Sequence, residues 1–407
     1  MITADPALHA ATKPVVDRAR SRTRAESCRA DNTAFAWTSY RRRGRGLHVP
    51  DMTSLFSPLS FGRLQLSNRI VMSPMTRSRA IGNVPNAMMA TYYSQRAAAG
   101  LLITEGTSPS PNGLGYARIP GLYSPEQIAG WRAVSDAVHA AGGRIFVQLM
   151  HTGRVGHPHN LPAGTRLLAP SALAAPGTMY TDAAGPQPLP SPATMTEDDI
   201  RVAIAEFTHA ARSAIAAGLD GIELHGANGY LLDQFLNTAS NQRSDSYGRT
   251  IAGRSRFVLE VARAAADAIG ADRVGIRVSP YGVFNGMVPD PETDELYGHL
   301  ATELSRIGLV HLHVVDHASM GAPPVPAVVK DLLRARFRGV YILSGGYDRA
   351  RAEADLAAGK GDLVAFGRPF LANPHLVAKL ERGAELLAAD PTTFYTPGEQ
   401  GYIDWPL

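Results

Sequence analysis

The feature of this sequence that most constrains its fold is a regular alternation of short apolar runs with segments of helical periodicity, from residue 69 to residue 366. Runs that are apolar throughout indicate parallel strands buried on both faces, because helices cover such a sheet on both sides. Eight such repeats favour a single (β/α)8 barrel with insertions over an open sheet. The expected strands are Arg69–Ser73, Gly100–Thr104, Arg144–Leu149, Gly218–Leu224, Arg273–Val278, Leu309–Val315, Val340–Leu343 and Asp362–Phe366. The expected helices are Met88–Ala99, Pro125–Ala141, Glu197–Ala217, Ser255–Ile269, Thr293–Ile307, Val325–Arg336 and Arg349–Ala358.

The longest segment outside this alternation is His151–Met195, which follows the third expected strand. It is rich in Pro, Gly and Ala and shows no convincing helical pattern. Long connections of this kind are either functional loops or inert surface insertions. We predict a lid over the mouth of the barrel, with an inert insertion as the alternative.

Composition limits the cofactors and partners of the chain. Its 407 residues contain one cysteine, Cys28, which excludes internal disulfides, cysteine-ligated zinc and iron–sulfur clusters. No apolar run approaches the ~20 residues of a membrane helix, so no membrane partner is expected. The first 50 residues hold ten basic and four acidic residues, which leaves −2 of the formal charge of +4 for residues 51–407. Such a body offers no net basic field for nucleic acid.

The basic N-terminal segment differs from the rest of the chain. Residues 1–51 lack hydrophobic periodicity and are predicted to be a disordered extension, whereas residues 52–407 form the barrel domain. The extension could be a transit peptide, a nucleic-acid-binding arm or sequence upstream of the true start. The compact apolar segment after Met52 favours the last interpretation. We expect a cytoplasmic protein that is a monomer or a small homo-oligomer.

The segment from His225 to Tyr230 carries the clearest chemical signal. It follows the fourth expected strand and sets an imidazole, a carboxamide (Asn228) and a phenol on a glycine-punctuated turn. His and Asn can together hold one carbonyl oxygen, and Tyr can give up a proton. These groups would polarise an enone and then protonate it. The alternative is a turn of ordinary surface polar residues.

Polar and glycine residues follow almost every other expected strand, where barrel enzymes gather their active-site groups. Gly345 and Gly346 follow the seventh strand, and Gly367 and Arg368 follow the eighth, which together favour a phosphate-binding site. The alternative is a left-handed turn beside an arginine salt bridge. His311 and His313 share one strand face, but with no carboxylate partner in view they are better interpreted as core residues than as a metal pair.

Several motifs in this order resemble the Old Yellow Enzyme family of FMN-dependent ene-reductases, which use a nicotinamide as electron donor. The resemblance runs from about Met52 to Leu407. The motifs are Pro74-Met-Thr-Arg77, Val147-Gln-Leu149 with His151-Thr-Gly-Arg154, His225-Gly-Ala-Asn-Gly-Tyr230, Gly275-Ile-Arg-Val-Ser-Pro280, Ser344-Gly-Gly-Tyr347 and Ala365-Phe-Gly-Arg-Pro-Phe-Leu-Ala-Asn-Pro374.

The resemblance implies a role for each matching residue. Thr76, in the loop with Pro74 and Met75, would bond the flavin O4, and Gly106 would leave room for the ring. Gln148 would bind the pyrimidine edge, and Arg277 would stabilise the anionic reduced flavin. The residues implied to hold the FMN phosphate are Gly345, Gly346, Gly367 and Arg368. Those implied to line the substrate pocket are Tyr116, Met150 and Tyr395, besides His225 and Asn228.

Met150 is a departure from the family, many members of which carry Trp there, so a wider pocket is expected. The function implied is an FMN-dependent oxidoreductase that passes hydride from NAD(P)H to α,β-unsaturated carbonyls, maleimides or nitro compounds. In this reaction His225 and Asn228 hold the acceptor oxygen and Tyr230 protonates carbon. The alternative is a (β/α)8 lyase or isomerase that binds a phosphorylated small molecule.

Overall fold

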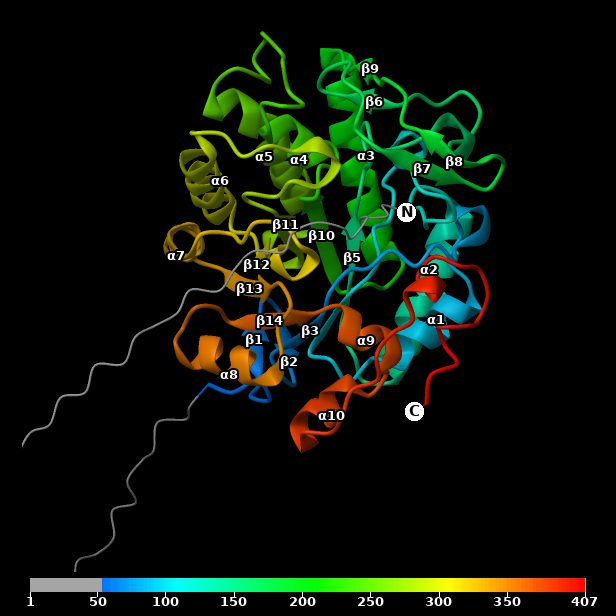
Figure 1. The fold of residues 1–407 in the computed structure, drawn as a ribbon, viewed down its shortest axis with the longest axis vertical. Helices are drawn as coiled ribbons and strands as arrows, with labels where there is room; N and C mark the ends of the chain where they lie inside the picture. The colour runs from blue at the N-terminus through cyan, green and yellow to red at the C-terminus, as the bar shows by residue number, and fades with distance from the viewer. Residues whose placement is uncertain (1–52, 407) are drawn as a thin grey trace, which may run out of the picture. The chain divides into compact units, whose positions relative to one another are not determined.

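The computed structural model describes residues 53–406, and within them eight parallel strands close into a barrel (Figure 1). The predicted disordered extension at 1–51 lies outside the described residues. The order around the barrel is β10-β11-β12-β13-β14-β3-β4-β5, so consecutive strands are neighbours and the last pairs with the first. The strands are β3 (Ile70–Met72), β4 (Leu101–Ile103), β5 (Ile145–Leu149), β10 (Gly221–Gly226), β11 (Val274–Val278), β12 (His311–Val315), β13 (Val340–Ser344) and β14 (Leu363–Phe366). The predicted (β/α)8 barrel is confirmed.

A helix follows each strand and covers the outside of the barrel. Several helices begin at a side-chain cap that satisfies free backbone N–H groups: Ser124 and Thr196 form capping boxes, and Thr250 caps the fifth helix. The seven predicted helices are α1 (Ala87–Ser94), α2 (Pro125–Ala140), α3 (Glu197–Ala216), α5 (Ile251–Ile269), α6 (Thr293–Ile307), α7 (Ala327–Arg336) and α8 (Arg349–Ala357). Three short helices were not predicted, α4 (Leu231–Leu236), α9 (Arg368–Ala372) and α10 (Leu376–Arg382).

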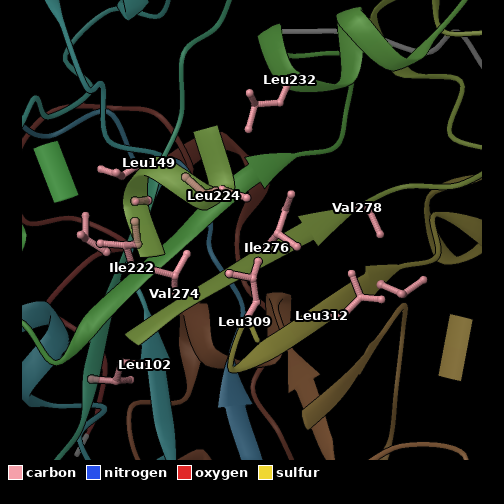
Figure 2. Close-up of a cluster of buried hydrophobic side chains, with 14 of the residues drawn as sticks. Leu102, Leu149, Ile222, Leu224, Leu232, Val274, Ile276, Val278, Leu309 and Leu312 are labelled. Carbon is pink, nitrogen blue, oxygen red and sulfur yellow. The ribbon is translucent and has the colours of Figure 1, made fainter. Parts of the chain in front are cut away.

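Alternate residues of the strands face two different environments. Ile222, Leu224 and Ile276 belong to the large apolar layer between strands and helices, part of which Figure 2 shows. Burying each such side chain stabilises the fold by about 1.5–3 kcal/mol. Inside the barrel, a second apolar cluster that includes Phe61 and Phe146 fills one end. The two-stranded sheet of β1 (Leu59–Phe61) and β2 (Leu64–Leu66) contributes to this cluster.

The segment His151–Met195 contains no α-helix, as the sequence predicted. It forms two small sheets, in which β6 (Leu168–Ala169) pairs with β9 (Ala193–Thr194) and β7 (Thr178–Thr181) with β8 (Gly185–Pro188). The apolar residues Val155, Ala175, Met179 and Leu189 of this segment form a buried cluster against Tyr116 and Tyr230. The segment therefore packs on the predicted substrate residues, which confirms a lid at the mouth of the barrel.

The boundary of the fourth strand differs from the prediction in a way that matters for function. The expected strand ended at Leu224, but β10 continues through His225 to Gly226. His225 pairs in register with Arg277 of β11, and Arg277 pairs with His313 of β12. The imidazole is therefore fixed by a strand, and only Asn228 and Tyr230 belong to the turn.

Candidate active site

The predicted site residues come from one end of the barrel, where the parallel strands finish. His225 and Arg277 lie near the C-terminal ends of β10 and β11, and Gln148 lies near the C-terminal end of β5. The other predicted residues lie in the connections that leave this end. Pro74, Met75 and Thr76 follow β3, Gly106 and Tyr116 follow β4, Met150 follows β5, Asn228 and Tyr230 follow β10, Gly345 and Gly346 follow β13, and Gly367 and Arg368 follow β14.

The side chains of His225 and Asn228 are free while their backbone is held. No side chain of residues 53–406 donates to or accepts from either side chain, and His225 Nδ1 and Asn228 Oδ1 are buried without a partner. By contrast, the backbone N–H of Asn228 donates to Ser279 Oγ at 2.9 Å, and its carbonyl accepts from Asn285 at 2.8 Å. Buried polar groups are almost always paired, so two unpaired ones at one strand end and the turn that follows it indicate a ligand site.

Burial holds the pKa of His225 well below its usual value, and the nearby charge of Arg277 acts in the same direction. The imidazole is therefore neutral at physiological pH, with one N–H to donate. A neutral donor suits a carbonyl oxygen, because it offers a hydrogen bond without a buried positive charge.

Tyr230 lies beside His225 and is paired with a second tyrosine. Its ring centroid is 4.8 Å from that of His225, and its hydroxyl is 2.9 Å from the hydroxyl of Tyr116. Burial raises the pKa of Tyr230 to about 12, although the hydrogen bond to Tyr116 opposes the shift. Tyr230 is thus protonated at neutral pH and has a neighbour that can donate to its oxygen once its proton leaves.

A buried carboxylate, Glu223, lies two residues before His225 on the same strand. Glu223 accepts from Gln148 Nε2 at 2.9 Å and lies 3.0 Å from His311 Nε2 and 2.8 Å from His313 Nδ1. The expectation that the two histidines lack a carboxylate partner is wrong, because Glu223 is that partner, and both residues are buried in the barrel interior as predicted. Burial lowers the pKa of Arg277, and the negative charge of Glu223 partly opposes this shift.

The Glu223 contact fixes the orientation of the Gln148 carboxamide. Because Nε2 is used by Glu223, Oε1 is the atom left to accept from a ligand. Gln148 is 2% exposed and Arg277 is 7% exposed, and Arg277 Nε is buried without a partner. An acceptor and a permanent positive charge are thus available at the top of the barrel interior.

Gly106 lies against Met150. A Cβ on Gly106 would come within 2.5 Å of Met150 Sδ, so no side chain fits there while the thioether keeps its place. The proposed wider pocket and the room that Gly106 leaves for a ring remain predictions. The structure shows that the two positions are coupled by direct contact.

The two glycine loops also depend on close backbone approach. Gly345 has φ 131° and Gly346 has φ 66°, and a Cβ on either would lie within 2.5 Å of the loop after β12. The backbone conformation therefore favours glycine at both positions. Gly367 follows the neighbouring strand β14, and Arg368 begins α9 with an exposed side chain.

The C-terminal segment that carries Tyr395 is tied to the loop after β3. Arg77 donates to the carbonyl oxygens of Phe394 and Gly401, and Arg79 donates to several carbonyls of the same segment. Arg118 Nη2 donates to the carbonyl of Tyr395 at 3.1 Å. The backbone of Tyr395 is thus held near the site, while its side chain is 45% exposed.

Glu105, which precedes Gly106, gives a prediction on stability. Burial raises its pKa to about 7, against the N–H groups of Arg77 and Ser78 that lower it. The native state therefore binds this proton more tightly than the unfolded chain does. Its contribution to stability is complete below the unfolded value of 4.5 and is lost as the pH rises through about 7. We expect the free energy of unfolding of wild type, measured with urea, to decrease between pH 5 and pH 8. Compared with that of Glu105→Gln over the same range, it should decrease by about 1–3 kcal/mol more. A difference that is the same at both pH values would contradict it.

Three residues of this site were not predicted from sequence: Glu223, Asp233 and Ser279. Glu223 is the one carboxylate within the strand segment Gly221–Gly226, and a charge inside a buried strand was a signal that could have been followed. Asp233 and Ser279 gave no such signal, because they contact each other across 46 residues of the chain.

The donors and acceptors present fit FMN. Arg277 Nε and His225 Nδ1, which have no partner among the described residues, the carboxamide of Asn228 and the glycine loops after β13 and β14 offer what a ring, a carbonyl ligand and a phosphate need. Among residues 53–406, no group of three His, Cys, Asp or Glu side chains is arranged to hold a metal ion. In the same part of the chain, no helix has both the length and the apolar character needed to cross a membrane.

Comparison with known proteins agrees with this fit. The model of the NADH:flavin oxidoreductase / NADH oxidase family matches residues 54–386. The chain is 43% identical to Chanoclavine-I aldehyde reductase fgaOx3 of Penicillium roqueforti, over 87% of this chain and 96% of the relative. It is 42% identical to a probable flavin mononucleotide-dependent alkene reductase of Leishmania infantum, over 87% and 97%. The structure of morphinone reductase in complex with tetrahydroNAD matches with a TM-score of 0.83 at 43% identity, over 87% and 97%.

These matches confirm the predictions of an oxidoreductase, of FMN and of a nicotinamide donor, and they leave no support for a lyase or isomerase. Because the family model covers most of the chain and relatives above 40% identity span it, the protein belongs to the NADH:flavin oxidoreductase / NADH oxidase family, the Old Yellow Enzyme family indicated by its motifs.

Proposed function

We propose that this enzyme is an ene-reductase in which His225, Asn228 and Tyr230 act on an α,β-unsaturated carbonyl, maleimide or nitro compound. The observation that carries the proposal is that the His225 imidazole lies beside Tyr230, whose hydroxyl is paired with that of Tyr116, and that His225 and Asn228, three residues apart, both have buried polar atoms without a described partner. FMN, when bound, supplies hydride exchange with the nicotinamide and with the alkene.

His225 and Asn228 are proposed to hold the acceptor oxygen. A neutral imidazole and a carboxamide each offer an N–H, and both lie at the mouth where solvent is limited by the lid. Hydrogen bonds to an oxygen that gains negative charge are stronger in the transition state than in the bound substrate. One such donor is typically worth about 10²–10³ in rate.

Tyr230 is proposed to give its proton to the carbon next to the carbonyl. It is protonated at neutral pH, and the Tyr116 hydroxyl can turn to donate to the tyrosyl oxygen as the proton leaves. The Tyr116–Tyr230 pair also forms the contact surface for the lid, which limits the entry of water. Tyr116, Met150 and Tyr395 are proposed to line the substrate pocket.

The remaining predicted residues are proposed to hold FMN. Gln148 Oε1 would accept from the ring, Thr76 would donate to it, and Arg277 would stabilise negative charge on it. The residues proposed to hold the phosphate are Gly345, Gly346, Gly367 and Arg368, and those proposed to contact the ring are Pro74, Met75 and Gly106.

A direct test is the visible spectrum of the purified protein, followed by release of the cofactor with heat or acid. We expect a yellow protein that releases FMN and not FAD, and that oxidises NAD(P)H when cyclohexenone is added. A colourless protein that takes up no added FMN would contradict the proposal.

Arg368→Ala should weaken FMN binding by about 10–100-fold, because it removes a charge-assisted contact to phosphate. The dissociation constant is measured by quenching of FMN fluorescence on titration with apoprotein. The control Arg263→Ala removes an exposed arginine of α5, on a different helix from Arg368, and should leave FMN affinity unchanged. Equal affinities for the Arg368 variant and wild type would place the phosphate elsewhere.

A small molecule is the partner that the family supports. We further propose a cytoplasmic enzyme that binds no nucleic acid and is a monomer or a small homo-oligomer. Light scattering of the purified holoenzyme measures its mass, and a titration with labelled DNA and RNA tests the absence of nucleic-acid binding.

A further inference from the structure

The turn that carries Asn228 has an uncommon backbone. Asn228 has φ 60° and Gly229 has φ 74°, so two consecutive residues lie in the left-handed region. A non-glycine residue in this region is strained and persists only when its surroundings hold it. The orientation of the Asn228 carboxamide therefore depends on the groups that hold the turn.

Asp233 is at the centre of those groups. Its Oδ2 accepts from the Gly229 N–H at 2.8 Å and from the Ser279 hydroxyl at 3.4 Å. Ser279 Oγ in turn accepts from the Asn228 N–H at 2.9 Å. The two N–H groups of the left-handed turn are thus held by one carboxylate, the first through Ser279 and the second directly. Oδ1 faces the other way and accepts from Tyr297 at 3.2 Å.

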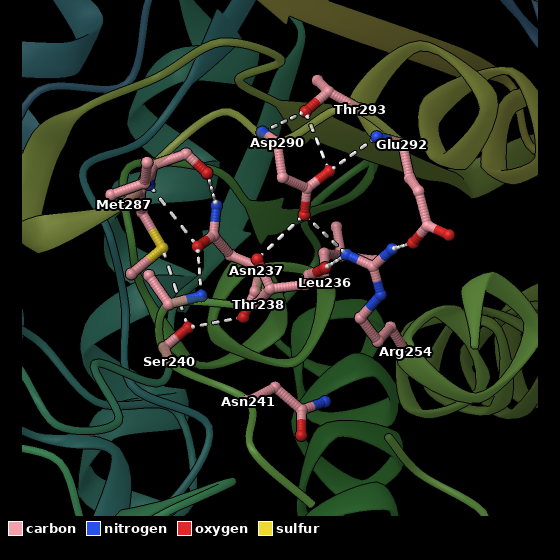
Figure 3. Close-up of polar contacts among 12 residues, drawn as sticks. Leu236, Asn237, Thr238, Ser240, Asn241, Arg254, Met287, Asp290, Glu292 and Thr293 are labelled. Carbon is pink, nitrogen blue, oxygen red and sulfur yellow. Dashed lines mark hydrogen bonds and ion pairs between the residues drawn. The ribbon is translucent and has the colours of Figure 1, made fainter. Parts of the chain in front are cut away.

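The short helix α4 that carries Asp233 is itself anchored, as Figure 3 shows at its C-terminal end. Arg254 Nη1 donates to the Leu236 carbonyl at 3.0 Å and to Asp290 at 3.2 Å. Asn237 Nδ2 donates to the Val288 carbonyl at 2.9 Å. Asp233 is therefore fixed by α5 and by the loop after β11, and it can serve as a rigid reference for the turn.

We propose that Asp233, acting through Gly229 and Ser279, is a positioning residue that sets the Asn228 carboxamide for binding the acceptor oxygen. The inference rests on the proposed function of Asn228. It assigns to α4 a part in substrate binding, although Asp233 does not itself touch the substrate in this arrangement.

Protonation of Asp233 should loosen this hold. Burial raises its pKa to about 6, and its three hydrogen-bond donors oppose the shift. All three partners are donors, and the Gly229 N–H cannot reverse, so an added proton on the carboxyl weakens the network. The charged and titratable groups beside Asp233 are Arg254 from α5, Tyr281 and Asp290 from the loop after β11, and Tyr297 from α6.

Phenol binding to the FMN-containing enzyme, followed by its long-wavelength absorbance, tests the proposal. Phenol stays un-ionised at about pH 5–8, since phenolic pKa values lie near 10. We expect wild-type affinity to fall about tenfold as the pH decreases through about 6. Asp233→Asn should bind phenol less tightly than wild type at pH 8 and show no inflection. Ser279→Ala should weaken binding about tenfold at pH 8 with FMN content unchanged.

Two control variants separate positioning from general damage. Tyr297→Phe removes the bond on the far side of the carboxylate, so affinity at high pH should stay normal while the inflection moves to higher pH. Glu105→Gln removes another buried carboxyl whose pKa lies in this pH range, and it should leave the inflection in place. If Asp233→Asn and Ser279→Ala both bind phenol like wild type at every pH, the proposal is wrong. If His225→Ala and Asn228→Ala also bind phenol normally, the proposed function itself fails.

Discussion

Replacing Tyr230 by Phe should slow reoxidation of the reduced holoenzyme by cyclohexenone by about 10²–10⁴-fold, while reduction by NAD(P)H stays near wild type. Reduction by a nicotinamide requires no proton on carbon, whereas saturation of the enone does. The substitution removes only the hydroxyl, and the ring contacts with His225 and the lid are kept. Stopped-flow absorbance of the flavin reports the two half-reactions separately.

Tyr116→Phe is the matched control, because it keeps the Tyr230 proton and removes only its hydrogen-bond partner. We expect it to slow enone reduction by about tenfold or less. Reoxidation of Tyr230→Phe by oxygen or a quinone should be unaffected, since neither needs a proton on carbon. Slowing of both half-reactions alike would make Tyr230 a structural residue, and another acid would have to protonate the substrate.

His225→Ala and Asn228→Ala should each slow enone reduction by about 10²–10³-fold and weaken phenol binding. Each substitution removes one of two N–H donors proposed for the same oxygen. Because both side chains lack partners among the described residues, their removal should cost the fold little. Phenol titration and single-turnover reduction of cyclohexenone measure the two effects.

Two further substitutions at these positions separate hydrogen bonding from shape. His225→Asn retains an N–H donor and should lose less activity than the alanine variant. Asn228→Asp replaces a donor by a carboxylate beside the oxygen, so it should bind phenol more weakly than Asn228→Ala. Normal phenol binding and turnover in both alanine variants would show that the carbonyl lies elsewhere.

The barrel was predictable because its signal is local. A parallel strand covered on both faces must be apolar along its length, and the apolar residues of a helix on the outside must recur every 3.6 residues. Both patterns can be recognised in short segments of the sequence between residues 69 and 366. The same reasoning located the strand ends and thereby His225, Arg277 and the glycine loops. It failed for α4, α9 and α10, which are only five to seven residues long and show too little periodicity.

The sequence by itself therefore determined the barrel, its family and the residue types at its mouth. Only the tertiary structure decided which of these residues meet. The Glu223 carboxylate contacts His311 and His313, which lie 88 and 90 residues further along the chain, and Ser279, directly after β11, connects Asp233 and Asn228 of the segment after β10. Such pairs exist only in the folded barrel, because folding brings the interiors of β10 and β12 and the ends of β10 and β11 together. The shifted pKa values of Glu105, Tyr230 and Asp233 have the same origin, since desolvation depends on everything that surrounds a group and not on its neighbours in the chain.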